Sequence, residues 1–206
     1  MTDRSESNPA AGAGSAFWQW FVRHEAELRT SAADHVPDRI EAELRRIDPR
    51  LGVELSDPGE QREMILTAWS RRDAFGAVRD LVAAAPAASL PNWQIIALKP
   101  PRGFRFSVDF EGLRIDAAGM RFDPLASPQA PEALGLRIYV SGAPPADERW
   151  SRALPLVIET GLGEEAAAEI AHIEPAPAPP PDEKALPLEQ LAAYVKWHRK
   201  TMIGDR

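Results

Sequence analysis

Apolar positions in the first half of the chain recur with the period of helices. Spacings of three and four residues place them on one face of each segment, as in an amphipathic helix. Three helices are predicted in this way. The first begins at Ser15, and the other two cover residues 34–50 and 73–85. Two short apolar runs, 51–56 and 63–70, lie on either side of a turn with Pro and Gly, which predicts an antiparallel hairpin.

Strand patterns dominate the middle of the chain. The stretch 92–100 is apolar almost throughout, which indicates a central strand. Polar and apolar residues then alternate in four segments separated by Gly or Pro, and alternation predicts strands with one face toward water. These strands are predicted at 104–110, 112–117, 120–124 and 136–141.

Two further elements complete the predicted fold. Residues 148–160 have helical spacing, and Pro155 either kinks this helix or marks its true start. A short strand is predicted at 169–174. Because helices and strands do not alternate strictly, we predict an α+β fold: a mainly antiparallel sheet with helices packed on one face, plus a C-terminal helix after a Pro-rich linker.

Composition divides the chain into four parts. Residues 1–15 are small and polar without an apolar period, so they are predicted to be disordered. A single α+β domain is predicted over 16–174. The prolines of 175–186 exclude regular hydrogen-bonded structure and predict an extended linker. Residues 187–203 have the spacing of an amphipathic C-terminal helix.

The C-terminal helix is the best functional indication in this pattern. Leu188, Leu191 and Val195 lie on its apolar face, which has to be buried. The helix either folds back on its own domain, pairs with a second copy of the chain, or binds in a groove of another protein. We therefore expect a protein partner, self or other, and we expect Leu191→Asp with Val195→Asp to abolish the docking.

Charge and composition exclude several classes of function. The 206 residues carry a net charge of −7, which disfavours nucleic-acid binding because that affinity depends on neutralising phosphates. The chain has no cysteine, which excludes disulfides, thiolate catalysis and iron–sulfur clusters. No apolar run approaches the roughly 20 residues that span a bilayer, and the start of the chain lacks the pattern of a secretory signal. We expect a soluble cytoplasmic protein.

Motifs with known chemistry are lacking. The sequence has no Gly-rich phosphate loop, no HExxH metal motif and no GxSxG nucleophile elbow. Its four histidines are scattered without metal-ligand spacing. We therefore predict no catalytic residue, no cofactor and no metal, and we favour a non-catalytic interaction or regulatory domain.

A small-molecule-binding protein or hydrolase-like enzyme is the alternative. Its pocket is expected near Lys99, Arg102 and the first helix, because strand ends are common anion sites. Glu25 or His24 would act as the acid–base group there. The competing interpretation of Glu25 is an ion pair with Lys99 or Arg102 that orients the helix on the sheet, and it is the one we favour.

The aromatic stretch FWQWFVRHE at 17–25 opens the first helix. Trp18 and Trp20 diverge by about 200° around a helix, so one of them is more exposed than the other. An exposed tryptophan near polar groups is a candidate contact residue, and Trp20 is retained as one. The stretch as a whole is predicted to be a packed helix with an orienting ion pair rather than a pocket wall.

Three stretches of the chain occur together in a familiar order. They are FWQWFVRHEAEL at 17–28, the segment 63–103 that contains AP and NWQIIALKP, and GLGEEAAAEIAHIE at 161–174. The combination resembles a group of uncharacterised bacterial proteins, domains of unknown function, over residues 17–174. The resemblance implies one soluble bacterial α+β domain and no particular activity.

Overall fold

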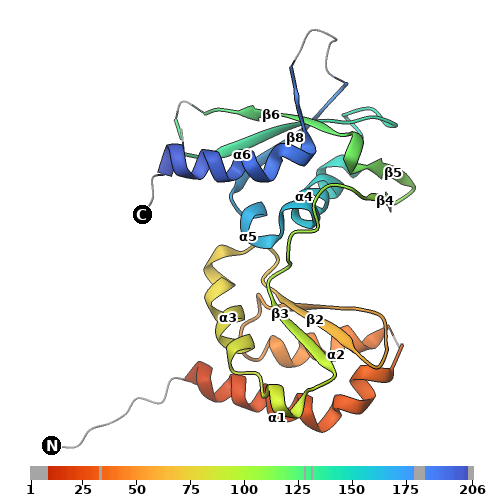
Figure 1. Ribbon diagram of the computed structural model, residues 1–206, viewed down its shortest axis with the longest axis vertical. Helices are drawn as coiled ribbons and strands as arrows, with labels where there is room; N and C mark the ends of the chain where they lie inside the picture. Colours follow the sequence, from red (N-terminus) through yellow and green to blue (C-terminus); the bar gives the residue numbers. More distant parts are fainter. Residues whose placement is uncertain (1–8, 33, 128, 131, 179–183, 204–206) are drawn as a thin grey trace, which may run out of the picture. The chain divides into compact units, whose positions relative to one another are not determined.

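The computed structural model describes residues 9–32, 34–127, 129–130, 132–178 and 184–203. It divides into two compact units, unit 1 (Met1–Lys99) and unit 2 (Pro100–Arg206), whose ribbons are shown in Figure 1. The single domain predicted over 16–174 includes residues of both units, and the boundary between the units lies after Lys99, near the end of the strand predicted at 92–100.

Unit 1 is built on a three-stranded sheet of order β1-β2-β3. β1 (Gly52–Leu55) pairs antiparallel with β2 (Arg62–Thr67), as predicted for the hairpin, and β2 pairs in parallel with β3 (Trp93–Ala97). The prediction that β3 is central is wrong, because β2 lies between it and β1. Of the five residues of β3 only Trp93 is buried, which agrees with its place at the edge of the sheet.

The helices of unit 1 bury side chains against that sheet. They are α1 (Pro9–Thr30), α2 (His35–Leu44) and α3 (Phe75–Ala83), with 3₁₀ turns at Arg72–Ala74 and Ala87–Ser89. Phe21, Ile40 and Val78, one from each α-helix, are fully buried. These three positions are among those that the helical spacing marked as apolar.

The boundaries of the first two helices differ from the prediction. α1 begins at Pro9 rather than at Ser15, so part of the segment 1–15, predicted to be disordered, is helical. Proline suits the first turn of a helix, and the alanines that follow favour helix even without an apolar period. Residues 1–8 lie outside the described part of the chain. α2 ends at Leu44, before the predicted end at residue 50.

Unit 2 contains a mixed four-stranded sheet of order β8-β7-β6-β9 and a separate hairpin. The central pair, β6 and β7, is antiparallel, whereas β7 and β8 are parallel. The strands of the sheet are β6 (Arg121–Leu125), β7 (Leu134–Tyr139), β8 (Ile170–Ala176) and β9 (Leu186–Pro187). The hairpin consists of β4 (Ser107–Phe110) and β5 (Leu113–Asp116).

The connection between the parallel strands β7 and β8 contains two of the helices of unit 2. The helices of this unit are α4 (Arg149–Leu162), α5 (Glu164–Ala167) and α6 (Leu191–His198), with 3₁₀ turns at Ala117–Gly119 and Leu188–Gln190 and a π-helical turn at Arg199–Ile203. Pro155 lies inside α4 rather than at its start. None of the described helices combines the length and apolarity needed to cross a membrane.

The fold is α+β, as predicted, but it uses three small sheets rather than one. The strand predicted at 169–174 is present and extends through Pro175 to Ala176, which shortens the linker expected at 175–186. Proline is tolerated there because β8 is an edge strand. Leu186 already pairs with β6, and residues 179–183 of the predicted linker lie outside the described residues.

Candidate functional site

The aromatic residues of α1 form the packed side of that helix. Phe17, Trp18 and Phe21 are buried. The ring of Phe21 lies edge-on to that of Trp93 on β3, with 4.9 Å between centroids. The indole N–H of Trp18 donates a hydrogen bond of 2.9 Å to the carbonyl oxygen of Leu81 on α3. These contacts agree with the interpretation of FWQWFVRHE as a packed helix.

Trp20, His24 and Glu25 are partly buried residues of the same helix. Nδ1 of His24 lies 2.8 Å from the carbonyl oxygen of Trp20, and the two rings are 5.0 Å apart. The Glu25 carboxylate accepts hydrogen bonds from Arg29 Nε at 2.9 Å and from Trp93 Nε1 at 3.0 Å. The Glu25 carboxylate therefore links α1 to β3, which is the orienting role that the sequence favoured.

The partners of Glu25 are not those proposed from the sequence. Lys99, the last residue of unit 1, forms an ion pair of 2.7 Å with Glu54 on β1. Its ammonium also lies 4.4 Å from the centroid of the Trp69 ring, within range of a cation–π interaction. Arg102, the other proposed partner, belongs to unit 2.

Three residues at the carboxyl ends of β2 and β3 have unusual backbone conformations. Trp69, Ser70 and Leu98 have φ angles of 53°, 61° and 63°, in the left-handed region that side chains disfavour. The Trp69 indole lies directly over Gly52, where a Cβ atom would come within 2.6 Å of Cζ2. Trp69 is 45% exposed, although it lies in the apolar run 63–70 that was predicted to be a strand of the hairpin. The reason is that β2 ends at Thr67, before the tryptophan.

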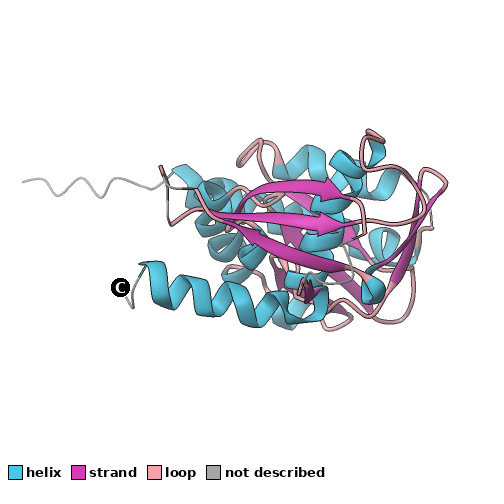
Figure 2. Cartoon of the chain, turned by 90° about the horizontal axis from the view of Figure 1, so that it is seen from above, coloured by secondary structure: helices cyan, strands magenta, loops and turns pink. Residues whose placement is uncertain are grey.

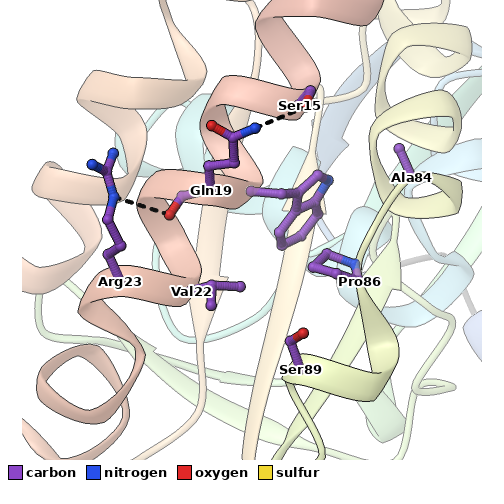
Figure 3. A pocket seen from close by; sticks show the side chains of 8 residues that line it. Ser15, Gln19, Val22, Arg23, Ala84, Pro86 and Ser89 are labelled. Atoms are coloured by element: carbon purple, nitrogen blue, oxygen red, sulfur yellow. Dashed lines mark hydrogen bonds between the residues drawn. The ribbon is translucent and has the colours of Figure 1, made fainter.

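An open groove of about 680 Å³ lies in unit 1 between α1 and the turn after α3 (Figure 3). Trp18 and Pro86 line it, together with Val22, which is 37% exposed. The guanidinium of Arg23 donates through Nε to the carbonyl oxygen of Gln19 at 3.2 Å and extends away from Pro86 in Figure 3. Because the guanidinium of Arg23 is directed along α1, the groove presents mainly apolar surface to a ligand.

A second hollow, of about 440 Å³, lies within unit 2 between the β4–β5 hairpin and α4. Arg102 stands at its rim, and the exposed side chains of Val108 and Leu156 border it. Its volume lies in the range of about 300–1,000 Å³ that is usual for small-molecule sites. Of the residues named for the predicted pocket, this hollow contains Arg102, whereas Lys99 and the first helix belong to unit 1.

The C-terminal helix packs its apolar face into the core of unit 2. Leu188 and Leu191 are 0% exposed and Val195 is 3% exposed, within a cluster that also includes Phe122 of β6. The ring of Tyr194 lies 5.8 Å from that of Phe122. Figure 2 shows α6 alongside the strands of this sheet. The face that the sequence marked for burial is thus buried in cis.

The outer face of the same helix carries large exposed apolar groups. Trp197 is 52% exposed and Met202 is 50% exposed. The side chains of Lys196 and Lys200 are exposed beside them. The spacing of the predicted helix at 187–203 placed Met202 on the buried apolar face, and its 50% exposure shows that this placement is wrong. The π-helical turn at Arg199–Ile203 changes the angle between successive side chains, so the α-helical spacing does not hold there. Trp197 was not singled out, because an amphipathic pattern identifies the inner face and says little of apolar residues on the other.

Buried polar groups of unit 1 serve the fold. The guanidinium of Arg62 is buried and donates to the carbonyl oxygens of Leu28 and Ser31, at the end of α1, and to that of Ser56. Burial lowers the pKa of Arg62. This cation satisfies carbonyls that the end of a helix leaves without partners. No sequence pattern indicates this role of Arg62, since the three acceptors are backbone atoms.

Metal-binding geometry is lacking among the described residues, where no group of three or more His, Asp or Glu side chains is placed to hold an ion. Comparison of the chain with models of protein families, with curated proteins and with solved structures found no match. The resemblance to uncharacterised bacterial proteins stays a prediction, and function has to be argued from the surfaces described above.

Proposed function

We propose that this chain is a non-catalytic interaction or regulatory protein of the cytoplasm, which contacts a protein partner through the outer face of α6. The observation that carries the proposal is the exposure of Trp197, 52% of a large aromatic side chain. Its ring lies 5.2 Å from that of Tyr194, which restrains it before any partner binds. Restrained aromatic residues of this kind supply much of the energy of protein interfaces.

The neighbours of Trp197 support a partner of particular chemistry. Met202, in the π-helical turn that follows α6, is a second large apolar side chain with half of its surface exposed. Turns of this kind are rare and are found frequently at functional sites. Lys196 and Lys200 border this apolar surface, and neither has an ion-pair partner among the described residues. An apolar patch beside two cations fits a partner surface with an apolar centre and carboxylates at its rim.

This proposal moves the contact from the inner to the outer face of the helix. The inner face, with Leu191 and Val195, is buried in unit 2 and has no surface left to offer. The non-catalytic assignment is supported by the two acid–base candidates, Glu25 and His24. Both are engaged in hydrogen bonds that hold α1 in place.

Photo-crosslinking in bacterial cells tests the proposed contact. The full chain carries a photoreactive phenylalanine analogue in place of Ala193, an exposed residue one turn before Trp197 that is not part of the proposed ionic rim, with and without Trp197→Ala. We expect a discrete protein adduct that Trp197→Ala abolishes. In a lysate of the same cells, where the ionic strength can be varied, the adduct should weaken as salt is raised, because the rim contact is ionic. Val22→Ala, which truncates an exposed apolar residue of unit 1, is the matched control and should leave the adduct unchanged. An adduct that survives Trp197→Ala, or no adduct at all, would overturn the proposal.

A second candidate function is small-molecule binding, without hydrolase chemistry. The hollow of unit 2 favours it, because an exposed guanidinium, that of Arg102, stands beside an apolar cavity. Apolar cavities with a few polar groups at fixed positions are the usual form of ligand sites.

A further inference from the structure

The hollow of unit 2 has buried apolar residues on its floor and exposed apolar residues at its edge. Ile115 of β5 and Val157 of α4 line the floor and are each 2% exposed. Val108 of β4 and Leu156 of α4 border the hollow and are 38% and 49% exposed. Single exposed apolar residues are common in proteins, but two that border one cavity form a patch that a ligand can cover.

One cation at the rim is fixed in place through its backbone. The N–H of Arg102 donates to the carbonyl oxygen of Thr160 at 3.0 Å, and the N–H of Gly103 donates to that of Gly161 at 3.0 Å. The following residue, Phe104, is buried and packs closely against Gly161. The segment that carries Arg102 is thereby attached to the last turn of α4, so little conformational freedom of the backbone is lost when a ligand binds.

The side chain of Arg102 differs from those of the neighbouring arginines. Arg105, also at the rim, forms an ion pair of 2.8 Å with Glu189. Arg152 of α4 forms a two-pronged pair with Glu111, with both distances 2.7 Å. The exposed guanidinium of Arg102 has no hydrogen-bond or ion-pair partner among the described residues. The hollow therefore has an unneutralised planar cation at its edge.

We propose that this hollow binds a small amphipathic carboxylate, with its apolar chain or ring on the floor and its carboxylate on the guanidinium of Arg102. The proposal rests on the second candidate function, ligand binding by unit 2. A guanidinium can bind a carboxylate in a planar, two-pronged geometry, which adds direction as well as energy to the contact. The exposed side chains of Val108 and Leu156 would cover the part of the ligand that lies between the floor of the hollow and the guanidinium of Arg102.

Calorimetry on the full chain tests this inference with two probes. Decanoate carries the carboxylate, and methyl decanoate is its neutral counterpart. We expect saturable binding of decanoate, and Arg102→Ala should weaken it about tenfold, as expected for the loss of one charge-assisted hydrogen-bonded contact. Binding of the methyl ester should be weaker and unaffected by Arg102→Ala. Leu156→Asn should weaken both probes.

The matched control is Arg114→Ala, which removes an exposed arginine from β5 without touching the lining of the hollow. It should leave both affinities unchanged, and thermal unfolding of each variant confirms that the exposed substitutions preserve the fold. If both probes bind equally and Arg102→Ala changes neither, ligand binding stands and the carboxylate inference is overturned. If neither probe binds, the inference and the second candidate function both fail, while the contact proposed for Trp197 is untouched.

Discussion

The inner face of α6 provides a stability prediction with a defined magnitude. Leu191 is 0% exposed inside the apolar cluster of unit 2, so Leu191→Ala leaves a cavity that the surrounding side chains fill only in part. Buried substitutions of this kind cost about 2–5 kcal/mol, and the sum of the transfer and cavity contributions places Leu191→Ala near the middle of this range, at about 3 kcal/mol.

Amide hydrogen exchange within unit 2 is the appropriate assay, because a chain with two compact units need not unfold in one transition. The free energy of opening is read from the slowest amides of β6 and β7, which adjoin the cluster. Trp197→Ala is the control on the same helix: it removes a larger side chain, but one that is 52% exposed. We expect the control to cost under about 1 kcal/mol, because substitutions of exposed residues have small effects on stability.

The comparison of the two variants decides whether α6 is part of the core. A loss below about 1 kcal/mol for Leu191→Ala, or a loss no greater than that of Trp197→Ala, would contradict the burial argument. The helix would then be an appendage whose inner face is available to a partner, and the proposal that assigns the contact to its outer face would need to be abandoned.

Three further predictions concern charge and packing. The hydrogen bond from the Arg50 guanidinium lowers the pKa of Asp48 from 3.8 to about 2. The stability that this carboxylate contributes is therefore fully present above the pKa of the unfolded state, and it is lost as the pH falls through the pKa of the folded state. Asp48→Asn should therefore lower the melting temperature near neutral pH, and the gap to the wild type should close between about pH 4 and pH 2 in thermal scans; a constant gap would contradict this. Gly161→Ala should cost about 1–3 kcal/mol in chemical denaturation, because the new Cβ overlaps the Phe104 ring and neither group has room to move; an unchanged midpoint would refute the close packing. Arg62→Met should destabilise the chain by about 1–3 kcal/mol and increase exchange of the last amides of α1, whose carbonyls lose their buried donor; unchanged exchange there would show that the cation is dispensable.

The elements with a local signal were predictable from the sequence. The β1–β2 hairpin follows from two apolar runs on either side of a Pro-Gly turn, and α3 follows from its helical spacing. The position of β3 at the edge of its sheet was not predictable, because an apolar run records burial and not the number of neighbouring strands. The boundary between the two units after Lys99 has no local signal either, because it depends on which segments contact each other over long distances.

The site residues show the same limit. That Glu25 would be paired was predictable, since a partly buried carboxylate on a packed helix needs a donor or a cation. Its donor from β3, Trp93, is 68 positions away in the sequence, and no spacing rule identifies such a partner. The exposure of Trp69 has no signal in the sequence, because the apolar run 63–70 continues past the last ladder pair at Thr67, whereas the backbone already has a positive φ at Trp69.

The C-terminal helix shows why an amphipathic pattern does not by itself locate a binding surface. The pattern identifies Leu188, Leu191 and Val195 as residues that must leave water, and a helix can satisfy that requirement inside its own unit. Once it has done so, the remaining chemistry of the helix lies on the face that the pattern ignores. There, the half-exposed ring of Trp197 is followed and preceded by exposed lysines, and a partner that covered the ring would remove apolar surface from water. We therefore place the proposed contact at Trp197 rather than at the residues that first drew attention to the helix.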